Sequence, residues 1–215
     1  MLSLISRQIR KVVVYPVLRM LYVYWDLLRG KIRKRAHPSH KMKLRCIERF
    51  QDEFNLPVFI ETGTYLGHTV KALKNNFQDI YSIELNDDLF VRANRMFSKF
   101  PHIHIIHGDS SRVLSELLPS ICGECLFWLD AHYWGGVTGE LALKSPVTQE
   151  LGAIRNHPIK GHVILIDDAR LFKGQDGWPD LQEIFALLRR INPYYAVEVK
   201  DDIIRAYIKN GRHSI

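Results

Sequence analysis

Three aspartates follow two apolar segments that read as buried strands. The segment 125–130 ends in Asp130, and the segment 163–167 ends in Asp167, which Asp168 follows directly. If the two segments are neighbouring parallel strands, the three carboxylates lie close together and raise one another's pKa unless a cation neutralises them. A hard divalent ion that prefers oxygen ligands suits such a site. The pattern therefore predicts a Mg²⁺ site at Asp130, Asp167 and Asp168 that lowers the pKa of a substrate hydroxyl.

A glycine-containing turn follows the first apolar strand of the chain. In the run from Phe59 to Thr69, Glu61, Gly63 and Gly67 form the pattern E-x-G-x-x-x-G, and Thr64 lies inside the turn. The glycines permit a tight turn and close approach of a ligand, and the helix that follows offers unpaired N–H groups. The loop carries no lysine or arginine, so it favours a cofactor without a diphosphate. An ordinary strand-to-helix turn without any cofactor is the alternative interpretation.

Further polar residues stand at the ends of the next two predicted strands. Glu84 lies about twenty residues beyond the glycine turn, where a carboxylate accepts hydrogen bonds from ribose hydroxyls. Both NAD and S-adenosylmethionine carry such a ribose, so Glu84 alone does not choose between them. Asp109 and Ser110 follow the segment 103–107, which is the third predicted strand. Ligands of open α/β sheets bind beyond the carboxyl ends of the strands, where these residues stand.

The elements that position these residues alternate between strand and helix. A helix is predicted at 41–54, and the C-terminal segments 194–199 and 203–208 alternate as in a hairpin. This rhythm indicates an α/β fold with a doubly wound, mostly parallel sheet and right-handed crossovers. The predicted strands between them are 57–61, 80–84, 103–107, 125–130 and 163–167, and the predicted helices are 69–75, 89–97, 111–118, 147–156 and 181–191.

The sequence resembles the class I S-adenosylmethionine-dependent methyltransferases over residues 56–208. The resemblance is carried by Glu61-Thr62-Gly63-Thr64, Leu129-Asp130 and Ile166-Asp167-Asp168, and it is strongest to the metal-dependent macrocin-O-methyltransferase-like group, which acts on sugar hydroxyls. It implies a Rossmann-like, seven-stranded fold and O-methyl transfer to a small acceptor that carries hydroxyl groups. The cofactor-binding residues that it implies are Glu61, Gly63, Thr64, Gly67, Glu84, Asp109, Ser110 and Asp130, with Asp109 and Ser110 at the adenine ring.

The chain departs from that group at His132. The group has an acid two residues after the strand-four aspartate, and that acid is thought to be the general base. Here Asp130-Ala131-His132 places an imidazole at the position. Histidine is a competent base near neutral pH, so we expect His132 and Asp130 to be the catalytic residues. A contact to metal or substrate, or a structural role, are the alternatives for His132.

The positive charge of the chain is concentrated at its N-terminus. Residues 1–45 carry a net charge of +11 and the remaining residues −4, which gives the overall +7. We divide the chain into a basic amphipathic helical extension, 1–40, and a methyltransferase-like domain, 41–215. Residues 1–36 suit either an anionic membrane surface or docking on the domain or on a second subunit as a homodimer, and nucleic acid is the least favoured partner.

The three cysteines do not form a disulfide framework. Cys122 and Cys125 have C-x-x-C spacing but lack a second ligand pair for zinc, so we interpret them as part of a loop that enters the next strand. Free thiols indicate a reducing, cytoplasmic setting, with attachment to the inner face of the membrane if the extension binds lipid. Two alternatives to a methyltransferase remain, a non-catalytic binding protein with the same fold and a nicotinamide-dependent oxidoreductase.

Overall fold

The computed structural model describes residues 38–130, 145–175 and 177–209. The chain divides into two compact units, Met1–Pro38 and Ser39–Ile215. The predictions for residues 1–36 therefore lie outside the described residues, as does the prediction for His132. Among the described residues, no helix is both long and apolar enough to cross a bilayer.

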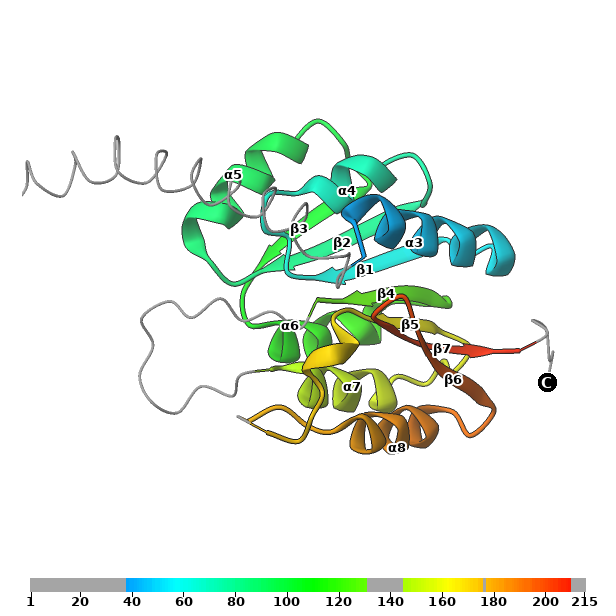
Figure 1. Cartoon of the computed structure of the whole chain (residues 1–215). Helices are drawn as coiled ribbons and strands as arrows, with labels where there is room; N and C mark the ends of the chain where they lie inside the picture. The colour runs from blue at the N-terminus through cyan, green and yellow to red at the C-terminus, as the bar shows by residue number, and fades with distance from the viewer. Residues whose placement is uncertain (1–37, 131–144, 176, 210–215) are drawn as a thin grey trace, which may run out of the picture. The chain divides into compact units, whose positions relative to one another are not determined.

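In the described part of the chain, seven strands form one sheet with the order β3-β2-β1-β4-β5-β7-β6 (Figure 1). The first five strands pair in parallel, while β7 pairs antiparallel with both β5 and β6. This arrangement confirms the predicted seven-stranded methyltransferase-like fold with a C-terminal antiparallel hairpin. The strands are β1 (Val58–Thr62), β2 (Asp79–Glu84), β3 (Ile103–His107), β4 (Cys125–Leu129), β5 (Val163–Ile166), β6 (Tyr195–Lys200) and β7 (Ile203–Ile208).

Helices cover both faces of the sheet, as Figure 1 shows. One face packs against α3, α4 and α5, and the other packs against α6, α7 and α8. Each parallel crossover thus brings the chain back to the edge at which the next strand begins. The helices are α3 (His40–Phe54), α4 (His68–Leu73), α5 (Asp87–Phe97), α6 (Ser110–Leu117), α7 (Val147–Asn156) and α8 (Leu181–Ile191).

The central strands are apolar on both faces, as expected for a sheet with two helical layers. All residues of β4 and β5 are buried. Along β4, Leu126 and Trp128 join the core beneath α3, whereas Phe127 and Leu129 join the core beneath α6 and α7. Because the strand is apolar on both sides, polar side chains are confined to its ends, and this places Asp130 at the carboxyl edge of the sheet.

The observed bounds follow the predicted elements closely. β3, α7, α8 and β7 have the predicted limits, and the other elements shift by one or two residues at their ends. Side-chain caps fix several helix starts. Asn86 accepts a hydrogen bond from the Leu89 N–H, and Asp180 forms a capping box with Glu183. Cys122 precedes β4, Cys125 begins it, and both thiols are free, in agreement with a loop that enters a strand.

Candidate active site

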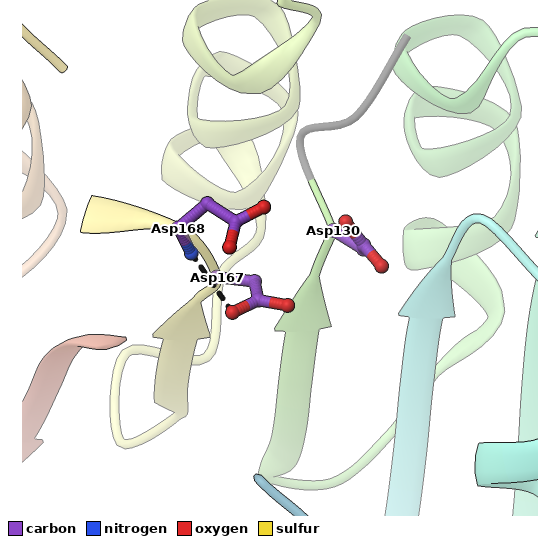
Figure 2. Close-up of side chains that lie close together, drawn as sticks. All are labelled: Asp130, Asp167 and Asp168. Carbon is purple, nitrogen blue, oxygen red and sulfur yellow. Dashed lines mark hydrogen bonds between the residues drawn. The ribbon is translucent and has the colours of Figure 1, made fainter. Parts of the chain in front are cut away.

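The three predicted metal ligands come together at the carboxyl edge of the sheet. Leu129 pairs with Ile166 in the parallel β4–β5 ladder, so the residues that follow them leave the sheet side by side. One carboxylate oxygen from each of Asp130, Asp167 and Asp168 lies within 4.8 Å of the others (Figure 2). Asp167 and Asp168 are buried and Asp130 is half-buried. We call these three residues the acidic cluster.

The backbone of the acidic cluster has an uncommon conformation at Asp168. Its φ of 54° lies in the left-handed region, which few residues other than glycine, asparagine and aspartate adopt. This turn lets the Asp168 N–H donate a 2.8 Å hydrogen bond to Oδ1 of Asp167, drawn as the dashed line in Figure 2. The bond fixes the Asp167 carboxylate against the Asp168 backbone. Oxygens of the two neighbouring carboxylates lie within 4.8 Å of each other, although residues i and i+1 of an extended strand would point apart.

Two cationic side chains contact the acidic cluster. Lys43 of α3 donates a hydrogen bond to Oδ2 of Asp167, and its Nζ lies 3.8 Å from Oδ1 of Asp168. Arg170 contacts both Asp168 and Asp202 through its guanidinium group. Arg170 thus forms an ion pair with the buried Asp168 two residues before it. Lys43 was not anticipated, because its distance of 124 residues from Asp167 leaves no local signal.

Burial and crowding of like charges act together on Asp167. Burial, helped by the nearby carboxylates of Asp168 and Asp130 and opposed by Lys43, raises the pKa of the Asp167 carboxyl group to about 6. Burial favours the neutral amine of Lys43, but the facing carboxylates outweigh it and hold the pKa of Lys43 above its ordinary value. Asp167 thus retains a raised pKa despite an ammonium group at hydrogen-bonding distance.

The glycine turn has the conformation that its residue types predict. Gly63 and Gly67 have φ values of 92° and 72°, and the Gly67 N–H donates to the Thr64 carbonyl oxygen over 2.8 Å. A Cβ at Gly67 would lie 2.9 Å from the Phe97 ring, so space as well as backbone conformation requires glycine there. Tyr65, at the tip, also has a positive φ of 48° and exposes its side chain.

Two of the predicted cofactor residues belong to a buried polar chain beneath this turn. Ser82 donates a 2.7 Å hydrogen bond to Oε2 of Glu61, and its hydroxyl also lies 2.7 Å from that of Thr64. Burial raises the pKa of Glu61 to about 8, against hydrogen bonds from Ser82 and Thr69. Glu61 is therefore largely protonated at neutral pH, and in this structure it braces β1, β2 and the glycine turn from within.

Glu84 links the glycine turn to the end of β2. Its Oε2 accepts the Tyr65 N–H over 2.7 Å and its Oε1 accepts the Asn86 N–H over 2.9 Å. Each carboxylate oxygen has a further lone pair, so these two bonds leave capacity for the predicted ribose contact. The bond to the strained Tyr65 was not foreseen, since a backbone donor gives no signal in the sequence.

Asp109 and Ser110 begin α6 and make mainly local contacts. Asp109 caps the helix by accepting the N–H groups of Ser111 and Arg112, at 3.0 and 3.3 Å. Ser110 donates a 2.6 Å hydrogen bond to Oε1 of Glu150, which is fully buried on α7. Burial raises the pKa of Glu150 to about 7. The sequence analysis did not identify Glu150, because a glutamate within a predicted helix gives no sign that its side chain is buried.

A cavity of about 70 Å³ opens beside the acidic cluster. Its walls come from α3, the start of α4 and the ends of β4 and β5, and they include His40, Lys43, Thr69, Trp128, Asp130 and Asp167. Burial, followed by the neighbouring His68 and Lys43, lowers the pKa of His40. The cavity thus combines two carboxylates, an ammonium group and a neutral imidazole. The predicted base His132 lies outside the described residues.

Solved structures of methyltransferases resemble this chain. One is an O-methyltransferase from Bacillus cereus in complex with SAH. The match covers 95% of this chain and 97% of that protein, with 13% sequence identity and a TM-score of 0.57. The SAH-bound methyltransferase PaMTH1 of Podospora anserina matches 88% of each chain, with 16% identity and a TM-score of 0.54. Another is a Staphylococcus aureus protein assigned as a caffeoyl-CoA O-methyltransferase. The match covers 96% of this chain and 98% of that protein, with 12% sequence identity and a TM-score of 0.55.

No protein-family model matches the sequence, and no curated protein matches it significantly. The narrower resemblance to the macrocin-O-methyltransferase-like group stays a prediction. The neighbours extend over nearly the whole chain and share its layered architecture. The chain therefore has the fold of the class I S-adenosylmethionine-dependent methyltransferases.

Proposed function

We propose that this protein is an S-adenosylmethionine-dependent O-methyltransferase, assisted by Mg²⁺, that acts on a hydroxyl group of a sugar or another small polyhydroxylated molecule. The observation that carries the proposal is the acidic cluster, which lies at the carboxyl edge of a methyltransferase fold beside its glycine turn. Among the three structures described above, two are O-methyltransferases by name and two were solved with SAH, which supports the choice of reaction and cofactor.

The residues at the glycine turn fit the cofactor. The turn offers backbone groups without a basic side chain, and Glu84 keeps free acceptor capacity for ribose hydroxyls. Asp109 and Ser110 lie at the end of the adjacent β3, where the resemblance places the adenine ring. Asp130 follows β4 next to Gly63, so one residue borders both the turn and the acidic cluster.

The donor set of the acidic cluster fits a hard divalent ion. Oxygens of the three carboxylates lie within 4.8 Å of one another, and such a set of hard oxygen ligands suits Mg²⁺. When bound there, Mg²⁺ supplies Lewis-acid stabilisation of the acceptor oxygen as its proton leaves. The cavity walls orient the acceptor, and the proposed role of His132 is to accept the hydroxyl proton. Positioning of the acceptor oxygen in line with the methyl group supplies much of the acceleration.

Calorimetry with S-adenosylmethionine, SAH and NAD tests the cofactor. We expect the first two to bind and NAD not to bind, and binding of NAD alone would instead support an oxidoreductase. Methyl transfer to a panel of sugars, catechols and small polyketides with and without EDTA tests the reaction. Cofactor binding without transfer to any acceptor would favour the non-catalytic alternative, and full turnover in EDTA would contradict the role of the metal.

For the N-terminal extension we propose binding to an anionic membrane surface on the cytoplasmic side. The net charge of +11 over residues 1–45 supports this. Flotation of the full chain with anionic vesicles, but not with zwitterionic ones, is the expected result, and deletion of residues 1–36 should abolish it. Equal flotation of both forms would contradict the membrane proposal, and a dimer that depends on the extension would favour docking on a second subunit instead.

A further inference from the structure

Lys43 brings a positive charge into the acidic cluster from a distant part of the chain. It stands in the first turn of α3, which starts after its N-cap Ser39 and packs against α4 and β4. Its side chain is only 20% exposed and reaches the carboxylates of both Asp167 and Asp168. The helix is held by the buried Cys46, Ile47 and Phe50, so the position of Lys43 relative to β5 is fixed by the core.

The ammonium group of Lys43 lies against two carboxylate oxygens that a metal ion in the acidic cluster could use. Mg²⁺ binds carboxylate oxygens at about 2.1 Å. Nζ of Lys43 hydrogen-bonds Oδ2 of Asp167 and lies 3.8 Å from Oδ1 of Asp168. An ion that shares these two oxygens would therefore overlap the ammonium group or lie against it. Two cations at such a separation also repel each other strongly in a partly buried site. The ion and the ammonium group thus exclude each other.

We propose that Lys43 is an internal cation that occupies the metal site and must withdraw before a divalent ion binds. The inference rests on the metal part of the proposed function and deepens it. The cavity beside the acidic cluster gives the displaced side chain a place to go, because His40, Thr69 and Trp128 surround open space next to Lys43. Ion binding then moves the Lys43 amine from the carboxylates into this cavity.

This arrangement has a measurable consequence for metal affinity. In the wild-type protein a divalent ion must break the hydrogen bond between Lys43 and Asp167, and a charge-assisted bond of this kind weakens ion binding by about tenfold or more. A neutral side chain at position 43 removes this competition. The affinity for the ion should therefore rise although a side chain that touches the site has been truncated.

The experiment measures binding of Mn²⁺ to the full-length protein by electron paramagnetic resonance of the free ion. Lys43→Met is compared with the wild type, and Lys41→Met is the matched control, because Lys41 lies on the same helix and is exposed. We expect Lys43→Met to bind Mn²⁺ about tenfold or more tightly than the other two. Lys43→Gln, with folding checked by thermal unfolding, gives a second neutral side chain if methionine disturbs α3.

Each other outcome overturns the inference in a distinguishable way. Equal Mn²⁺ affinity in all variants means that Lys43 does not compete, while the metal proposal survives. Weaker binding in Lys43→Met means that Lys43 supports the site instead. No Mn²⁺ binding by any variant removes the metal from the proposed function and the inference with it. Calorimetry with S-adenosylmethionine on the same samples reports separately whether the cofactor site is intact.

Discussion

A buried pair of histidines joins the starts of the two strands that carry the acidic cluster. The Cys125 N–H donates to Nδ1 of His162 over 3.0 Å, so the proton of that ring is on Nε2. Nε2 of His162 lies 2.9 Å from Nδ1 of His157, and Nε2 of His157 lies 3.0 Å from the Ile121 carbonyl oxygen. One arrangement satisfies every contact, with each neutral ring donating to the next acceptor. We call these three hydrogen bonds, from Cys125 through His162 and His157 to Ile121, the histidine relay. It connects the beginning of β4 to the residue before β5.

Protonation of this relay should destabilise the protein. A second proton on His162 places two donors face to face at the Cys125 N–H, and burial, followed by His157, lowers the pKa of His162 from 6.5 to about 3. The unfolded chain then binds more protons than the folded one between these values, so stability is present above pH 6.5 and falls as the pH decreases. From pH 7 to pH 5 the loss from His162 is about 2 kcal/mol.

Urea unfolding at pH 7 and pH 5 measures this loss. His162→Gln should lower the stability at pH 7, because the relay is broken, yet it should lose about 2 kcal/mol less than the wild type between the two pH values. His104→Gln is the control, since that ring is 40% exposed and carries no comparable cost of burial. An unchanged pH dependence in His162→Gln would refute the assignment of a neutral relay.

Three further predictions concern the site. Asp167→Ala should abolish methyl transfer, because Asp167 belongs to the acidic cluster. The affinity for S-adenosylmethionine, measured by calorimetry, should stay within a few-fold, because Asp167 is not part of the glycine turn. A large loss of cofactor affinity would contradict this division. Gly67→Ala should lower the free energy of unfolding by about 1–3 kcal/mol, because φ is 72° and a Cβ would lie 2.9 Å from Phe97. Urea unfolding measures this, and an unchanged free energy of unfolding would refute the steric argument. Glu150→Gln should raise the melting temperature relative to the wild type at pH 8 but not at pH 4. Burial raises the pKa of Glu150 to about 7, so the wild type loses stability as the pH rises through that value, whereas glutamine does not ionise. Equal differences at both pH values would show that Glu150 does not carry this cost.

Local patterns predicted most of the fold, because the helices and the strands of an α/β sandwich each have a characteristic spacing of apolar residues in the sequence. The apolar runs of β4 and β5 indicated strands covered on both faces, and the acids that follow them marked the carboxyl edge. The glycine turn was predicted from residue type alone, since positive φ values at Gly63 and Gly67 require glycine.

The contacts made by predicted site residues were harder to foresee. Asp109 caps α6, and Glu84 accepts two backbone N–H groups, so both hold the chain as well as facing the proposed cofactor site. Partners such as Lys43 and Glu150 come from helices remote in sequence. Their roles depend on which helix face meets which strand end, and a single sequence does not record that pairing.

The sequence by itself determined the parallel sheet, the glycine turn and the three aspartates at adjacent strand ends, because hydrophobic period and backbone restriction are local properties. Only the tertiary structure decided the order β5-β7-β6, the burial of Glu61 and the ion pairs of the acidic cluster with Lys43 and Arg170. These features arise from contacts between distant segments, where packing and electrostatics select one arrangement among many that the local patterns allow.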